Sequence, residues 1–161
     1  LSAFCGRAEI MDLFQPVGPV QHSGTFNAQL IPVLAGLAFL AEATQPEFYT
    51  RLRELETAFH AGVEKIIARH DLHMVVPRHG ARFNILLGRK TPAVRYEDVF
   101  SHDKAIMLEF VKACYDRGVY FHDYGGAPAH HGYSVQHTLK DIADVLNVMD
   151  EVLGNLKDKL R

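Results

Sequence analysis

Two long segments repeat apolar residues at helical spacing, and they constrain the fold more than any other feature. The first follows "TQPE" at 44–47, where Thr44 can cap a helix, Glu47 can reach back and Pro46 suits the first turn. The second follows "TLKD" at 138–141, with Thr138 as the cap. The inward residues are Phe48, Leu52, Leu55, Phe59, Val63, Ile66 and Ile67, then Leu139, Ile142, Val145, Leu146, Met149, Val152, Leu153 and Leu156. Each helix is expected to bury its apolar face, so the fold needs a second layer of structure against which these faces can pack.

Short β-rich segments lie between these helices and supply that layer. The expected strands are residues 73–80, 81–88, 119–122 and 133–136. A third amphipathic helix is predicted over 103–118, closed by Gly118 near its C-cap. A few antiparallel strands covered by long helices define the α+β class.

The N-terminal part differs from the rest of the sequence. "LSAFCGRAEIMDLF" starts without Met, and we predict the end of a strand at 1–4 and a short helix at 6–14. After a turn-rich break, residues 29–43 are expected to form a largely buried helix. An apolar start of this kind resembles the middle of a domain, so we expect the chain to be part of a longer protein.

Composition excludes several classes of function. The chain has 161 residues and a net charge of −2, so it offers no basic field for nucleic acid or an anionic membrane. The apolar run at 30–43 is too short to span a bilayer. Cys5 and Cys114 lie far apart, which predicts a reduced, cytoplasmic setting without a disulfide.

Ten histidines raise the question of a metal site. The pairs are His70 with His73, His122 with His137, and His130 with His131. Zinc requires three or four converging ligands, and here no cysteine partner and no HExxH pattern accompanies them. We expect no metal site, and we interpret His137 as a structural residue at the start of the last helix.

"HSGT" at 22–25 stands just before a predicted helix. Unpaired backbone N–H groups at a helix entrance favour an anion, and hydroxyl side chains can assist them. The same residue types also cap helices without binding any ligand. The local pattern leaves both interpretations of Thr25 open.

Three segments together resemble one family, the class III aminotransferases, which are pyridoxal-phosphate (PLP) enzymes of fold type I. They are "LSAFCGRAEIMDLF", "GPVQHSGTFNAQLIPVLAGLAFL" and "GVYFH…HGYSVQHTLKDI". Within the family, the sequence is most similar to glutamate-1-semialdehyde 2,1-aminomutases and the related amino-acid aminotransferases. The resemblance runs in register from residue 1 to about 153. It implies the C-terminal part of an α/β parent: residues 1–28 end the large domain, and 29–161 form the linking helix and the small α+β domain.

The resemblance also implies a site and a partner. Gly24, Thr25 and Phe26 would contact the PLP phosphate held by the neighbouring subunit of a homodimer, with the Thr25 hydroxyl as a donor and Gly24 allowing a close backbone approach. One stretch and one single residue depart from the family pattern. Asn27 to Leu30 replace the usual Gly-Asn-Pro-Leu, and Cys5 replaces a glycine.

The cofactor lysine of the family precedes the segment that matches "LSAF", and none of the seven lysines here stands at its position. We therefore assign no catalytic residue and expect the 161-residue chain alone to be inactive. The parent would move an amino group on a small amino or keto acid, as an aminotransferase or an aminomutase. The alternative is a non-catalytic, free-standing domain that associates with another chain.

Three further residues are candidates for contacts with the substrate. Arg82, at the start of an apolar strand, could clamp a carboxylate or simply pair with a surface acid. By resemblance, His130 and His131 would border the substrate entrance, although both could equally be solvated residues of a loop.

Overall fold

The structure is a computed structural model that describes residues 2–100, 102–123 and 129–161. The chain divides into two compact units, Leu1–Pro46 and Glu47–Arg161. The boundary expected near residue 28 concerns the domains of the parent protein, and it stays a prediction.

The first unit contains two helices, α1 (Ala8–Met11) and α2 (Leu30–Ala43). Three rings gather in it: Phe4 lies 5.2 Å from Phe14 and 4.9 Å from His22, measured between ring centroids. The strand expected at 1–4 is absent from residues 2–4, and residue 1 lies outside the described residues. The reason is that a strand needs a hydrogen-bonded neighbour, and the unit offers none beside this segment.

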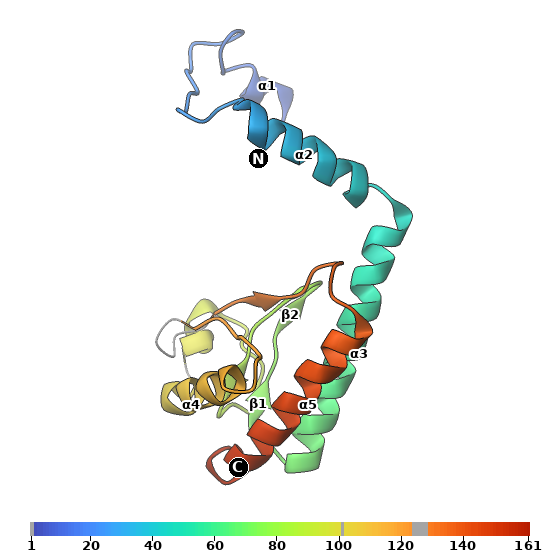
Figure 1. Cartoon of the computed structure of the whole chain (residues 1–161). Helices are drawn as coiled ribbons and strands as arrows, with labels where there is room; N and C mark the ends of the chain where they lie inside the picture. The colour runs from blue at the N-terminus through green and yellow to red at the C-terminus, as the bar shows by residue number, and fades with distance from the viewer. Residues whose placement is uncertain (1, 101, 124–128) are drawn as a thin grey trace. The chain divides into compact units, whose positions relative to one another are not determined.

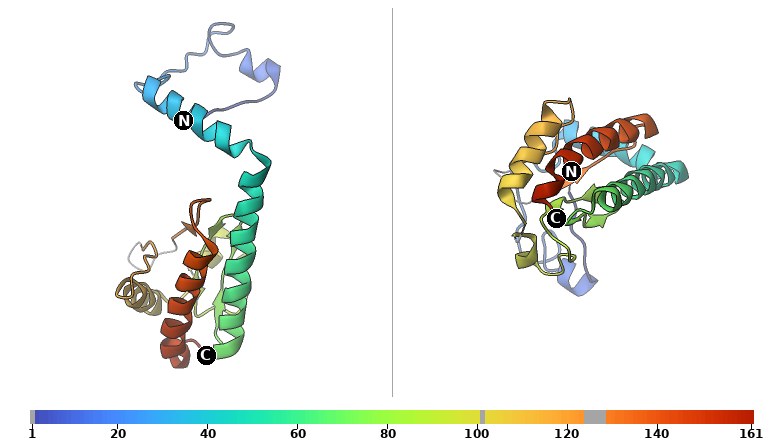
Figure 2. Two further views of the ribbon diagram at one scale, coloured as in Figure 1. Left: turned by 45° about the vertical axis from the view of Figure 1, so that its right-hand side comes forward. Right: turned by 90° about the horizontal axis from the view of Figure 1, so that it is seen from below.

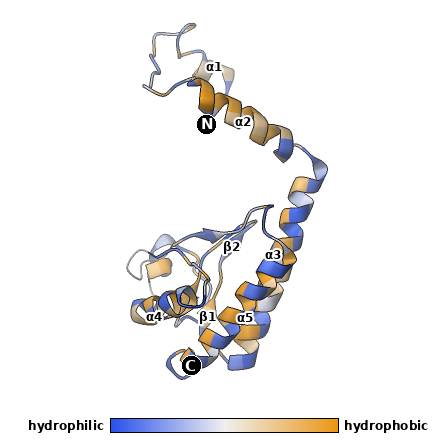
Figure 3. Ribbon diagram, viewed as in Figure 1, coloured by the Kyte–Doolittle hydropathy of each residue, from blue (hydrophilic) through white to orange (hydrophobic). Residues whose placement is uncertain are grey.

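Helix α2 is exposed, whereas the sequence predicted a largely buried helix. Of its residues only Ala43 is buried, while Leu30, Ile31 and Leu37 are 67%, 77% and 60% exposed. Figure 3 shows apolar residues along most of the helix. A helix that is apolar all round needs cover on every side, and a unit of this size has too little other chain to supply it.

The capping role expected of Thr44 is also wrong. Its hydroxyl donates to the carbonyl of Leu40 at 2.8 Å, and its backbone forms the C-cap of α2. Pro46 does stand at the first position of the next helix, as predicted.

The second unit has two layers (Figures 1 and 2). One layer consists of helices α3 (Pro46–His70), α4 (Lys104–Tyr115) and α5 (Leu139–Leu156), with α5 in the middle. The other layer holds the strands. They are β1 (Met74–Val75), β2 (Arg78–His79), β3 (Arg82–Phe83), β4 (Leu86–Leu87) and β5 (His131–Gly132). Two 3₁₀ helices, Tyr96–Phe100 and Lys157–Lys159, complete the unit.

The strands described in the second unit pair antiparallel: β1 with β4, and β2 with β3, which also pairs with β5. The α+β class is thereby confirmed. The two strands expected at 73–80 and 81–88 are each broken in two, because Pro77 has no N–H for a ladder and its carbonyl accepts instead from Asn84 N–H at 2.9 Å.

The last two expected strands are wrong. Residues 119–122 and 133–136 form no strand in the structure, and the chain pairs at His131–Gly132 instead. Register explains the shift, since Phe83 opposes His131 and Arg82 opposes Gly132. An added Cβ at residue 132 would lie 2.9 Å from the Ala81 carbonyl oxygen, so glycine permits this close approach.

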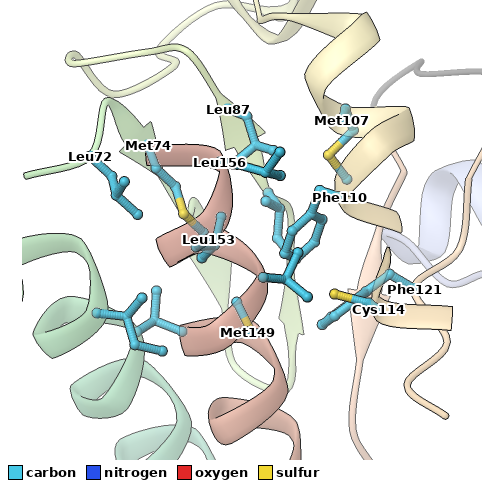
Figure 4. Close-up of a cluster of buried hydrophobic side chains, with 14 of the residues drawn as sticks. Leu72, Met74, Leu87, Met107, Phe110, Cys114, Phe121, Met149, Leu153 and Leu156 are labelled. Carbon is cyan, nitrogen blue, oxygen red and sulfur yellow. The ribbon is translucent and has the colours of Figure 1, made fainter. Parts of the chain in front are cut away.

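The core lies where the helices meet the strands. Figure 4 shows Met149 and Leu153 of α5 close to Phe110 of α4, and all three are buried. The predicted capping box of α5 is confirmed, with Thr138 and Asp141 bonded reciprocally. Leu139, expected to face inward, is 49% exposed instead. Gly118 has a φ of +81° just beyond α4, the left-handed conformation that ends many helices.

Among the described helices, none combines the length and the apolar character that crossing a bilayer demands.

Candidate functional site

The turn at Gly24–Asn27 carries the phosphate contact that the resemblance implies. The N–H of Asn27 donates to the carbonyl of Gly24 at 3.0 Å, and the turn is exposed. Helix α2 begins only at Leu30, with Gln29 as its N-cap and no side-chain cap. The capping alternative for Thr25 is therefore wrong, because Thr25 stands too far before the helix to bond its first amides.

Several donors in this turn are available to a ligand. Within the described residues, the hydroxyl of Thr25 and the amides of Thr25 and Phe26 make no hydrogen bond. An added Cβ at Gly24 would lie 2.9 Å from Oδ1 of Asn27, so the Asn27 side chain lies directly beside the glycine. Asn27 is a polar group that the sequence marked only as a departure from the family pattern.

The electrostatics of the turn suit an anion. The sequence has no charged side chain between Asp12 and Glu42, so the turn and its neighbours along the chain carry no carboxylate. Neutral N–H and O–H donors would supply the contacts, as backbone nests do for other phosphates. The residues of the turn therefore fit a phosphate group.

The three substrate candidates lie in the second unit, and the structure does not bring all of them together. Arg82 is exposed on β3 and its side chain lies over Gly132, with Cδ 3.1 Å from the position of an added Cβ. His130 is also exposed. His131 opposes Phe83, and both are 6% exposed, so it faces the interior. Neighbouring residues of a strand point to opposite faces, which separates His131 from Arg82.

The structure removes the alternative interpretation for two of the three candidates, whereas exposed His130 still fits a solvated loop residue. Within the described part of the chain, no carboxylate forms an ion pair with Arg82, so the surface pair considered for it is absent. His131 belongs to a strand and is buried, so the solvated-loop alternative fails for it.

His130 and His131 both line a cavity of about 270 Å³ between the helix layer and the strands. Burial, with smaller contributions from His122 and His130, lowers the pKa of His131 to about 4. Its Nε2 atom has no hydrogen-bond partner among the residues described. A buried polar atom left in this way costs free energy unless something else bonds it.

A second buried histidine, His60 of α3, was missed by the sequence reasoning. It is 3% exposed, and its Nε2 also lacks a partner within the described residues. Burial first, then the nearby charge of Arg78, lowers its pKa to about 4. Its position three residues before Val63, on the buried side of the helix, was the available signal.

Two further histidines, His70 and His137, have structural roles in the second unit. His70 Nε2 lies 2.8 Å from Oδ1 of Asp150, which joins α3 to α5. His137 Nδ1 accepts from the N–H of Ser134 at 3.0 Å just before α5, the structural role expected for it. No group of three or more potential metal ligands occurs in the described parts of the chain.

Comparison with known proteins gives the same family as the resemblance. No family model matches the chain. A glutamate-1-semialdehyde 2,1-aminomutase from Clostridium kluyveri is 32% identical over 119 residues, which are 73% of this chain and 28% of that protein.

Three solved structures share the fold. A transaminase with PLP bound matches 97% of this chain with a TM-score of 0.76 and 21% identity. A β-phenylalanine aminotransferase from Variovorax paradoxus matches 96% with a TM-score of 0.80 and 23% identity. An ω-transaminase from Sphaerobacter thermophilus matches 92% with a TM-score of 0.75 and 23% identity.

These matches confirm the resemblance: the chain is class III aminotransferase-like, similar to a C-terminal part of such enzymes. The chain spans only about a third of the length of the proteins it matches, 28% of the aminomutase and 34–35% of the three structures.

Proposed function

We propose that this chain forms part of a PLP-dependent aminotransferase or aminomutase that acts on a small amino or keto acid in the cytoplasm. The observation that supports this most is the exposed, donor-rich turn at Gly24–Asn27, located in the segment that resembles the family's phosphate contact. The 32% identity to an aminomutase supports the same class of chemistry.

In this proposal the turn binds the cofactor phosphate of a companion subunit in a homodimer. The Thr25 hydroxyl and the amides of Thr25 and Phe26 donate to the phosphate oxygens, and Gly24 leaves room beside them. PLP, when bound, supplies the electron sink that amino-group transfer requires. Exposure of Thr25 is what allows a second polypeptide to reach it.

Two residues of the second unit are proposed to orient the substrate. Arg82 is exposed, and its guanidinium could hold a substrate carboxylate through two parallel hydrogen bonds. His130 is exposed two residues before Gly132, which pairs with Arg82, and would contact the polar groups of the same substrate. Amination of an external keto acid would indicate an aminotransferase, and isomerisation of a semialdehyde without a co-substrate would indicate an aminomutase.

The experiment uses the full reading frame that contains this chain. Thr25→Ala should weaken PLP binding by about tenfold or more, since a hydrogen bond to a charged group is lost. Thr25→Ser keeps the hydroxyl and should retain most of the affinity. Thr57→Ala serves as a control, because the Thr57 hydroxyl donates to Arg53 within α3. Unchanged PLP affinity in Thr25→Ala would contradict the proposed phosphate contact.

The isolated 161-residue chain is expected to show no aminotransferase activity and to form no borohydride-reducible PLP adduct, since none of its lysines stands at the family position. A covalent pyridoxyl peptide from this chain would overturn that expectation.

The second candidate is a non-catalytic domain that associates with another chain. The exposed apolar surface of α2 favours association of some kind. The gene sequence upstream of Leu1 distinguishes the two proposals: a glycine-rich segment and a lysine there support the enzyme, and their absence supports the non-catalytic domain.

A further inference from the structure

We propose that the cavity beside His131 binds a small, neutral aromatic molecule that carries one hydroxyl group, with Nε2 of His131 as its hydrogen-bond partner. The site lies within the second unit, whereas the proposed phosphate contact belongs to the first. His130 also lines this cavity, and Arg82 lies over its lining residue Gly132, so the site borders the two residues proposed to orient the substrate. The binding test below uses the isolated chain and needs no PLP, so its outcome does not depend on the proposed function.

Aromatic rings form the walls of this cavity. His131 lies 5.3 Å from Phe121 in an edge-on arrangement and 5.4 Å from Phe83 in a tilted one, measured between ring centroids. Phe59 and Tyr133, which also line the cavity, are 5.9 Å apart. Ring faces and edges of this kind pair well with a further aromatic ring in stacked or edge-to-face geometry.

The volume fits a molecule with a single ring. A cavity of about 150 Å³ already holds benzene in another protein, and drug-sized ligands occupy about 300–1,000 Å³. The volume of about 270 Å³ found here lies between these limits. One ring with a small substituent is therefore the ligand size that we infer.

His131 supplies one buried polar atom of the site, and the hydroxyl of Tyr133, which also lines the cavity, likewise has no partner among the described residues. His131 is 6% exposed, and its Nε2 has no partner among the described residues. Which ring nitrogen carries the proton decides whether Nε2 donates or accepts. A hydroxyl group satisfies both cases, because it is a donor and an acceptor at once.

The residues that line the cavity favour a neutral ligand over a charged one. The cavity-lining residues that the structure describes include no Asp, Glu, Lys or Arg. Burial lowers the pKa of His131 to about 4, so its imidazole is neutral at pH 7. An ammonium group would lose its hydration in this cavity without gaining a counter-charge, and a carboxylate would meet histidine side chains but no Lys or Arg among the described lining residues.

Phenol and toluene are suitable probes, because phenol carries a hydroxyl group on the ring where toluene carries a methyl group. We expect the 161-residue chain to bind phenol saturably at pH 7, measured by ligand-observed NMR and by the rise in melting temperature. His131→Phe should lower the ratio of phenol affinity to toluene affinity by about tenfold, through the lost hydrogen bond. Retained toluene binding would show that the cavity of this variant is still open.

His60→Phe is the matched control. It removes the other buried histidine beside Phe83, whose Nε2 is equally unpartnered in the described structure but which does not line this cavity. The phenol-to-toluene ratio should be unchanged in it. The proposal is overturned if the native chain binds no phenol at millimolar concentration, if only water is detected in the cavity, or if both variants change the ratio equally.

Discussion

The ring of Phe83 packs against two buried histidines. The His60 and His131 rings lie 5.9 Å and 5.4 Å from it, and neither has a partner for Nε2 within the described residues. The pKa of each falls to about 4 because burial disfavours the charged imidazolium. Arg78 adds to the effect at His60, and His122 and His130 add to it at His131.

These two histidines should make stability depend on pH. Their ordinary pKa is 6.5 and the folded-state pKa is about 4, so between these values the unfolded chain binds more protons. Their contribution to stability is complete above pH 6.5 and is lost progressively as the pH falls toward 4. We expect urea unfolding midpoints to fall from pH 7 to pH 5.

The double variant His60→Phe/His131→Phe should show a smaller fall over the same range, because it has neither imidazole to protonate. A fall as steep as that of the native chain would show that other groups control the acid sensitivity.

Helices α3 and α5 pack closely at Gly62. An added Cβ there would lie 2.3 Å from Cδ1 of Leu146 and 3.0 Å from its Cγ, closer than real contacts allow. Gly154 plays the same part further along, where an added Cβ would lie 3.0 Å from Cε1 of His70. Glycine has a low helix propensity, and at both positions this cost is offset by a close contact between α3 and α5.

A double-mutant cycle tests this contact. Gly62→Ala alone should lower the free energy of unfolding, because Leu146 must move. In a Leu146→Ala background the same change should raise it by about 1 kcal/mol, the gain in helix propensity of alanine over glycine. Urea denaturation measures both effects. If the sign of the Gly62→Ala effect were the same in both backgrounds, the contact would not be the reason for the glycine.

The elements that sequence reasoning predicted well depend on local signals. The capping box at Thr138 and Asp141 bonds within one turn, and the apolar spacing of α3 needs no distant partner. The first two expected strands contain β1 to β4, but the last two were wrong, because the two-residue strand β5 forms only through pairing with the distant β3. His131 was taken for a loop residue for the same reason, whereas exposed Arg82 lies on a strand as predicted.

At the scale of the whole molecule, the exposed apolar surface of α2 is the feature that should most affect whether the chain associates in solution. Leu30, Ile31, Leu34 and Leu37 are all more than half exposed, in contrast to the buried apolar side chains of the second unit. The sequence could show that this helix is apolar on all sides, but not what covers it. A contiguous patch of this kind favours association.

The isolated chain should therefore self-associate. Leu34→Glu/Leu37→Glu should raise the monomer fraction in sedimentation velocity by placing charges on the exposed surface of α2. Leu108→Glu is the control, since Leu108 is 42% exposed on α4 in the other unit and should leave the distribution unchanged. A native chain that is monomeric at tens of micromolar would contradict the prediction.

The central position of α5 in the helix layer has a consequence for biosynthesis. The ribosome makes α3 and α4 before α5, yet α5 lies between them and supplies core residues such as Met149 and Leu153. Until residue 156 has left the exit tunnel, the apolar faces of α3 and α4 lack α5, their partner within the helix layer. Chaperones that recognise apolar helix faces would therefore bind the nascent chain during that interval, rather than after its release from the ribosome.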